Sequence, residues 1–106
     1  MPKFMVSASY TVEGLQGLKK EGASGRAKAV EELVASQGGS VEALYWAFGD
    51  HDVVVIAELP DNSSAAAVAL SVSASGAATC TTTVLLSAEE VDRAVQARVL
   101  YRPPGT

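Results

Sequence analysis

The stretch from Val41 to Asp61 constrains the fold of this chain more than any other. Two apolar segments, 41–48 and 52–59, are rich in residues that favour β-strands, and the polar pair Gly49-Asp50 lies in the turn between them. Pro60-Asp61 then ends the second strand and supplies a helix N-cap. The stretch therefore predicts a β-hairpin that is followed directly by a helix.

The rest of the chain alternates strand patterns with helix patterns. Alternating apolar and polar residues predict strands at 4–10 and 78–86. Apolar residues at helical spacing predict helices over 23–37 and 62–75, each followed by glycine, which ends helices at low conformational cost. The segment from Thr11 to Gly25 contains four glycines and is expected to be a loop or an irregular helical turn.

A last helix is predicted after strand 78–86, because Ser87-Ala88-Glu89-Glu90 has the sequence of a capping box. The order β-α-β-β-α-β predicts a ferredoxin-like α+β fold with a four-stranded antiparallel sheet and an extra C-terminal helix. Both central helices are then expected on one face of the sheet. Residues 1–101 are predicted to form a single domain and residues 102–106 a flexible tail.

Length and composition exclude several classes of function. The chain has 106 residues, enough for one core, and a net charge of −4 without a basic run, which argues against a nucleic-acid partner. No stretch approaches the roughly 20 apolar residues of a membrane span, and the N-terminus lacks the pattern of a leader. We expect a cytoplasmic protein with no membrane partner. The single cysteine excludes an internal disulfide.

The strand at 41–48 predicts self-association, because both of its faces are apolar. Strict alternation places Leu44, Trp46 and Phe48 on the face opposite the helices. Leaving each large side chain in water forgoes about 1.5–3 kcal/mol. A second copy of the sheet is the simplest cover, so we expect a homodimer or a higher homo-oligomer. The alternative is that the C-terminal helix or the tail folds back over this face.

Several short motifs, in this order and spacing, resemble those of the GYD domain family over about residues 4–97. The motifs are Tyr10-Thr11, Gly38-Gly39, the hairpin 48–55, Glu58-Leu59-Pro60-Asp61 and Ala88-Glu89-Glu90. The resemblance implies a ferredoxin-like fold related to dimeric α/β barrels and implies no particular reaction.

The family is named for a Gly, Tyr, Asp signature. This chain has Gly49 and Asp52 in place, but His51 stands where the resemblance implies a tyrosine.

His51 and Asp52 are the candidate catalytic residues. A histidine next to carboxylates can act as a general base or bind a metal ion. The structural alternatives are a solvated turn residue at His51 and, at Asp52, a carboxylate that caps the hairpin by accepting backbone N–H bonds. Regular alternation places the two side chains on opposite faces, which weakens a direct pair.

The sequence predicts neither a metal nor a cofactor. It has no spacing typical of a transition-metal site, and Cys80, among Thr and Val, is expected to be a small core residue rather than a nucleophile. Aromatic side chains could instead line a pocket between the sheet and the helices, and Arg26 could hold an anion there. The candidate ligand-binding residues are Tyr10, Tyr45, Trp46, Phe48 and Arg26.

Two functions of different classes follow from these residues. The first is a homo-oligomer in which paired sheet faces create a pocket for a small molecule, and it needs no ionisable residue. The second is a cofactor-free oxygenase or isomerase of the dimeric α/β barrel kind, acting on a small aromatic or polyketide-like compound, in which His51 and Asp52 handle protons. The first is favoured, because the chain has one histidine and no compact acid–base pair. The second is analogy with fold relatives.

Overall fold

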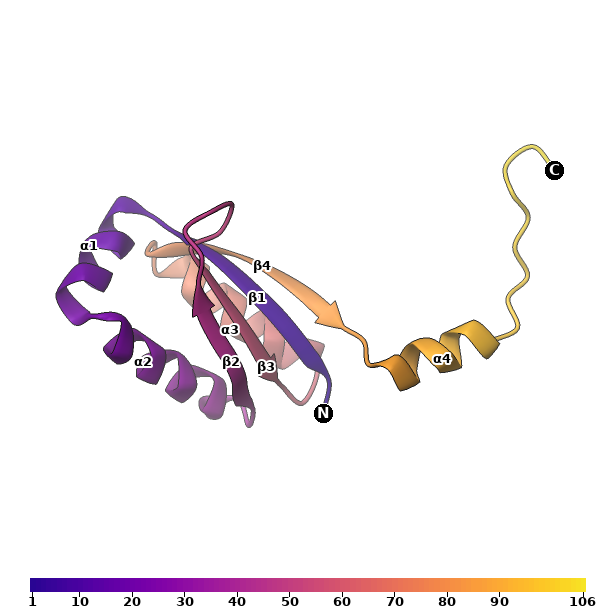
Figure 1. Cartoon of the computed structure of the whole chain (residues 1–106), viewed down its shortest axis with the longest axis horizontal. Coiled ribbons are helices and arrows are strands. Elements are labelled where there is room, and N and C mark those ends of the chain that lie inside the picture. The colour runs from indigo at the N-terminus through magenta and orange to yellow at the C-terminus, as the bar shows by residue number, and fades with distance from the viewer.

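The computed structural model describes all residues, 1–106, as four strands and four α-helices (Figure 1). In chain order the elements are β1 (Lys3–Tyr10), α1 (Val12–Glu21), α2 (Ala23–Ser36), β2 (Ser40–Trp46), β3 (Val53–Glu58), α3 (Asn62–Ala74), β4 (Ala78–Leu85) and α4 (Ala88–Gln96). No helix is long and apolar enough to cross a membrane.

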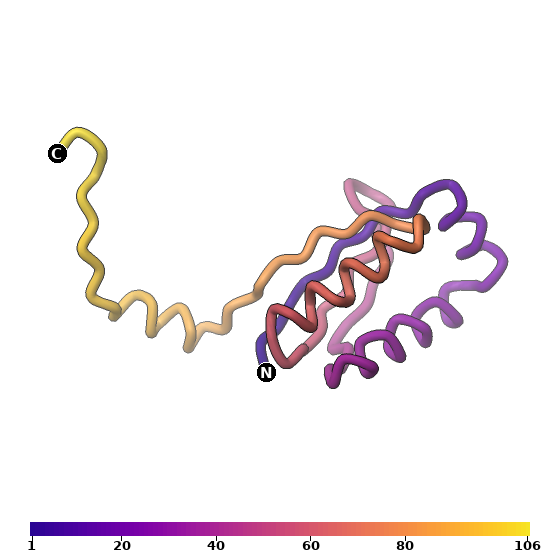
Figure 2. Tube along the Cα trace, turned by 180° about the vertical axis from the view of Figure 1, so that it is seen from behind, coloured from indigo at the N-terminus to yellow at the C-terminus, as the bar shows by residue number.

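The strands form one antiparallel sheet in the order β2-β3-β1-β4. Helices α2 and α3 lie on the same side of it, and Figure 2 shows α3 in front of the strands with α2 beside it. This arrangement confirms the prediction of an α+β fold with a four-stranded antiparallel sheet, and the element order is consistent with a ferredoxin-like fold. The other side of the sheet, which we call the open face, carries no helix.

The core lies between the sheet and helices α2 and α3. Alternate residues of β1 and β3 point toward the helices, so the inward positions of both strands are buried. Most core side chains are small, and only Phe4 and Leu59 are large and almost completely buried. The core residues are Phe4, Val6, Ala8, Val34, Val53, Val55, Ala57, Leu59, Ala65, Val68 and Ala78.

Residues 12–21 form a regular helix, α1, so the prediction of a loop or irregular turn over 11–25 is wrong. Thr11 caps the helix, because its side chain accepts a hydrogen bond from the Gly14 N–H at 3.2 Å. The Thr11 N–H also donates to the Ala77 carbonyl at 2.9 Å, which ties the start of α1 to the turn before β4. Gly22, at φ +86°, ends α1 and starts α2.

Strand β2 carries an irregularity that reverses the expected facing of its residues. The register with β3 shifts between Val41 and Ala43, as in a β-bulge, so Leu44 and Trp46 pair with inward residues of β3 and pack against the core. The prediction that Leu44 and Trp46 face away from the helices is therefore wrong. Tyr45 takes the open face instead and is 73% exposed.

Helix α4 leaves the body of the domain and does not cover the open face (Figure 1). Its capping box is present as predicted, with the Ser87 side chain and the Glu90 backbone N–H 3.1 Å apart. Every residue from Leu86 to Thr106 is exposed. The chain consequently extends 57 Å along its longest axis.

Candidate functional site

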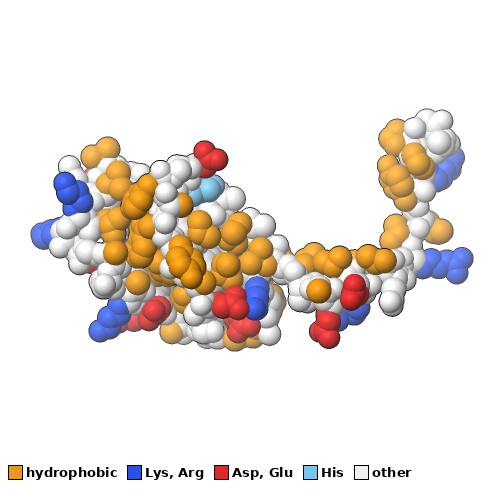
Figure 3. Space-filling model, in the orientation of Figure 1, with side chains coloured by type: hydrophobic (Ala, Val, Ile, Leu, Met, Phe, Trp, Pro, Cys, Tyr) orange, Lys and Arg blue, Asp and Glu red, His pale blue; other side chains and the backbone are white.

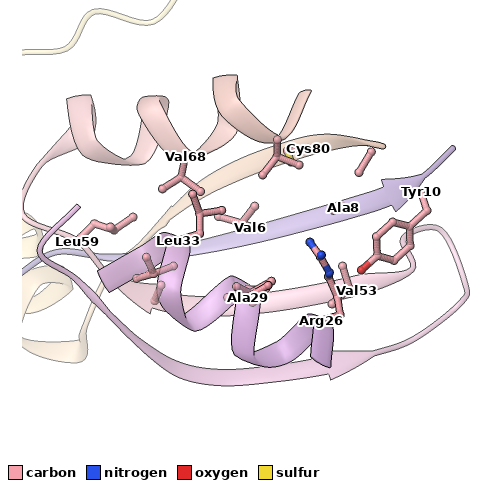
Figure 4. A pocket seen from close by; sticks show the side chains of 16 residues that line it. Val6, Ala8, Tyr10, Arg26, Ala29, Leu33, Val53, Leu59, Val68 and Cys80 are labelled. Carbon is pink, nitrogen blue, oxygen red and sulfur yellow. The ribbon is translucent and has the colours of Figure 1, made fainter. Parts of the chain in front are cut away.

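An apolar cavity of about 100 Å³ lies between the sheet and helices α2 and α3 (Figure 4). Fifteen of its sixteen lining residues are hydrophobic, and the exception is Arg26. Leu59 lies toward one end of the cavity, and Tyr10 and Arg26 lie at the other. The cavity exists because inward positions of the sheet and of α2 carry Ala and Val, whose short side chains leave the space between the layers partly unfilled.

A second, wider depression of about 530 Å³ adjoins the cavity beneath α1, and we call it the outer groove. Four of its nine lining residues are charged, Glu13, Lys20, Glu21 and Arg26, and the others are Tyr10, Gly14, Gly17, Leu18 and Ala77. Tyr10 and Arg26 are the two residues that line both spaces. They form the boundary between an apolar interior and a groove that carries charged side chains, which is an arrangement that suits an amphipathic small molecule.

Arg26 is held in place by Glu21 across the joint between α1 and α2. Its Nε and Nη2 atoms donate to the two carboxylate oxygens of Glu21 at 2.8 Å and 2.9 Å. This contact raises the pKa of Arg26 and lowers the pKa of Glu21. The guanidinium has further N–H groups that these two bonds do not use, and they remain available to an acceptor.

Tyr10 contributes a neutral hydroxyl at the same boundary. Burial raises the pKa of Tyr10, while the neighbouring Trp46 indole and the Arg26 charge act in the opposite direction. The phenol is therefore protonated at neutral pH and can donate a hydrogen bond. In Figure 4 the Tyr10 hydroxyl and the Arg26 side chain point toward one another.

Trp46 adds an unsatisfied donor near this boundary. Its indole N–H is buried and makes no hydrogen bond of ordinary length, although it lies close enough to the Tyr10 hydroxyl to lower the pKa of Tyr10, and Trp46 itself lines neither the cavity nor the outer groove. A buried polar group without a partner costs about 1–3 kcal/mol, so such groups are rare in native proteins.

Asp52 positions Tyr10 rather than pairing with His51. Its Oδ2 atom accepts a hydrogen bond from the Tyr10 backbone N–H at 2.8 Å, where the ladder between β1 and β3 ends. The His51 ring instead lies beside Ser9, with its Nδ1 atom 3.5 Å from the Ser9 hydroxyl oxygen. The two candidate catalytic residues thus have different partners, and no hydrogen bond joins them.

Tyr45 and Phe48 lie outside the cavity. Tyr45 is on the open face, and Phe48, in the loop after β2, is 61% exposed. Phe48 has φ +53°, which is strained for a bulky residue. Of the five predicted ligand-binding residues, the structure brings Tyr10 and Arg26 together, places Trp46 beside Tyr10 but on neither space, and separates Tyr45 and Phe48 from them.

Cys80 lines the cavity and is a half-buried thiol. Burial raises its pKa, with the Ser73 hydroxyl acting in the opposite direction, so the sulfur is protonated at neutral pH. No three or more His, Cys, Asp or Glu side chains gather into a group that could hold a metal ion. The site therefore offers an apolar space in the cavity and, in the outer groove, the cations Arg26 and Lys20 together with the carboxylates of Glu13 and Glu21.

The outer groove was not anticipated from the sequence. Glu21 was not predicted as a site residue, because its segment is rich in glycine and of mixed polarity and was expected to be a loop. The spacing Glu21 to Arg26 could have suggested an ion pair across the Gly22 joint.

A family model described as GYD domain matches residues 4–95, from β1 into α4. The chain belongs to the GYD domain family. The match confirms the resemblance inferred from the hairpin and its flanking motifs. Comparisons of this GYD domain with curated proteins and with solved structures found no match. The cavity and the outer groove of the GYD domain are both formed by residues within the matched range.

Proposed function

We propose that this GYD domain is a homo-oligomeric binding protein that holds a small amphipathic molecule at the boundary between the cavity and the outer groove. The observation that carries the proposal is that Tyr10 and Arg26 line both spaces. The short apolar part of the ligand enters the cavity, and its polar head remains in the outer groove. The pocket therefore lies between the sheet and the helices of one chain, not between two sheets.

The polar end of the site favours a ligand that carries hydrogen-bond acceptor atoms, and most of all an anionic ligand. Arg26 supplies a positive charge with unused N–H groups, and Tyr10 supplies a hydroxyl. A carboxylate can accept from several such donors at once, and charge-assisted bonds of this kind contribute about 1.5–3 kcal/mol each. A short-chain carboxylate has both required parts, a short apolar chain for the cavity and an anionic head for the outer groove.

Trp46 makes the proposal directly testable, because it is the only tryptophan in the chain. Titration with hexanoate is expected to change the Trp46 fluorescence saturably, while hexylammonium, with the opposite head charge, is expected to leave it unchanged. Replacing Arg26 by Gln is expected to weaken hexanoate binding at least tenfold.

The control is Arg93→Gln, which removes a positive charge from exposed α4, far from the cavity. Hexanoate should bind this variant as it binds the parent. Equal affinities of the parent and of Arg26→Gln, or a signal that never saturates, would contradict the proposed site.

Self-association is the second part of the proposal, and the uncovered open face supports it. The outward residues of the sheet include large apolar side chains that no helix covers, and Figure 3 shows hydrophobic side chains gathered over this side. The apolar residues of the open face are Met5, Ala43, Tyr45, Val54, Ile56 and Leu85. Monomeric proteins rarely leave a patch of this kind in water, so a second copy of the chain is expected to cover it.

The enzymatic alternative has less support. A general base needs a partner that orients it, and the carboxylate of Asp52 is already engaged by the Tyr10 N–H while His51 lies beside Ser9. Under the binding proposal, His51→Ala keeps the affinity for hexanoate. Loss of binding in a folded His51→Ala variant would instead place His51 in the site.

A further inference from the structure

The segment from Leu86 to Tyr101, which we call the C-terminal arm, has no partner within its own chain. All of its residues are exposed, and neither α4 nor the residues after it pack extensively against another element. Its large apolar side chains would normally be buried. They are Leu86, Val91, Val95, Val99, Leu100 and Tyr101.

Helix α4 is amphipathic although both of its faces meet solvent. Val91, Ala94 and Val95 lie on one side, and Glu89 and Arg93 lie on the opposite side. The helix has only nine residues. Isolated helices shorter than about 12–15 residues are marginal in water, so most of the stability of such a helix must come from packing its apolar side. The apolar stripe of α4 therefore requires a surface that its own chain does not supply.

The surface area of the chain is too large for a compact monomer. The chain exposes 7225 Å², whereas a compact monomer of its mass, 10.9 kDa, exposes about 5,600 Å². The radius of gyration is 16.8 Å, against about 13 Å for a compact domain of this length. The excess area is roughly 1,600 Å², and a stable interface needs about 800 Å² from each partner. One chain therefore has ample surface to bury against a second copy.

The junction between β4 and α4 directs the C-terminal arm away from its own sheet. Only Leu86 and Ser87 separate the two elements. The capping box is closed in both directions, with the Ser87 N–H donating to Glu90 Oε1 at 3.0 Å and the Glu90 N–H donating to Ser87 Oγ at 3.1 Å. These bonds fix the start of α4 directly after Ser87, and Figure 2 shows the arm leading away from the sheet.

We propose that the C-terminal arm is exchanged between two copies of the chain, so that the apolar stripe of α4 packs on the open face of the other copy. This inference rests on the proposed self-association and adds the segment that mediates it. It matches two surfaces that the chain leaves unpartnered, the arm and the open face. Reciprocal exchange gives a closed, two-fold symmetric dimer in which both copies bury the same surfaces.

Full-length variants that act on each surface test the exchange. Val91→Glu combined with Val95→Glu places charges on the apolar stripe of α4, and both positions are already exposed, so the domain is expected to fold. Analytical ultracentrifugation is expected to show a dimer dissociation constant at least tenfold higher than that of the parent. Arg93→Glu changes the net charge by the same amount on the opposite side of α4 and is expected to dimerise like the parent.

A second variant, Tyr45→Lys, disrupts the open face on an edge strand, and it is also expected to dimerise at least tenfold more weakly. Mixing the two weakened variants is the decisive step. Exchange pairs one unmodified arm with one unmodified face, and it pairs the introduced glutamates of the other arm with the lysine that replaces Tyr45. The mixture is therefore expected to contain a mixed dimer that dissociates at least tenfold less readily than either variant alone.

Native mass spectrometry distinguishes the mixed dimer by its mass. If the doubly substituted arm variant dimerises as tightly as the parent, exchange of the arm is wrong while self-association stands. If both variants are monomeric and their mixture is too, the arm does not dock on a second copy, and exchange is again wrong. A monomeric parent would overturn both exchange and the proposed self-association.

Discussion

At the scale of single residues, two glycines of α1 meet different surroundings. A Cβ atom added at Gly14 would collide with the backbone carbonyl oxygen of Ala77, whereas one added at Gly17 would meet nothing within 4 Å. We expect Gly14→Ala to lower the free energy of unfolding by about 1–3 kcal/mol through overpacking. Gly17→Ala is expected to raise it by about 0.5–1 kcal/mol, because alanine favours the helix. Urea denaturation of both variants measures the difference.

The two substitutions control for each other, since both put alanine for glycine in the same helix. Two equally stabilised variants would mean that α1 does not press against the turn before β4. The outer groove would then lose one of its walls.

At the same scale, the chemistry of individual site residues was only partly predictable. Tyr10, Trp46 and Arg26 were singled out because aromatic residues are few and arginine binds anions. The meeting of Tyr10 and Arg26 at one boundary depends on the packing of α2 against the sheet. The role of Asp52 in holding the Tyr10 backbone follows the capping interpretation of the sequence, because an aspartate next to a turn readily accepts backbone N–H bonds.

At the scale of elements, the start of α3 gives a prediction about pH. Asp61 caps α3, and its Oδ1 atom accepts from the Ser64 backbone N–H at 2.8 Å, which lowers the pKa of Asp61 below its usual value. The stabilising effect of this carboxylate is present above the pKa of the unfolded chain and is lost as the pH falls through the lower folded pKa. The parent is therefore expected to lose stability as the pH falls below about 4, the ordinary pKa of an aspartate.

Asp61→Asn is the matched variant for this prediction, because asparagine caps helices about as well as aspartate and does not titrate. Thermal melts across this pH range should show a smaller decrease in Tm for Asp61→Asn than for the parent. Parallel decreases in the two proteins would show that the charge of Asp61 contributes nothing to the cap.

The elements that local chemistry determines were predicted, and those that depend on partners were not. The hairpin, the cap at Asp61 and the capping box at Ser87 each arise from a few neighbouring residues and are present in the structure. The irregularity in β2 arises from its pairing with β3, so strict alternation misplaced Leu44 and Trp46. Helix α1 was missed because it is rich in glycine and has no buried residue.

At the scale of the whole molecule, the chain leaves apolar surface uncovered, although the residues that form it differ from those predicted. Leu44 and Trp46 face the core, yet the sheet still has an uncovered side, and the C-terminal arm adds exposed apolar surface that the sequence patterns did not reveal. A buried hydrophobic core of only 11 residues in a chain of 106 is small for a domain that stands alone. Oligomerisation is one of the ways by which small domains compensate for such a core.

Native mass spectrometry of the purified full-length protein at micromolar concentration tests the proposed self-association directly. We predict a mass that is twice that of the chain, or an even multiple of it, with no ligand added. A single species at the mass of one chain, 10.9 kDa, would contradict it, because the open face and the C-terminal arm would then both be stable in water.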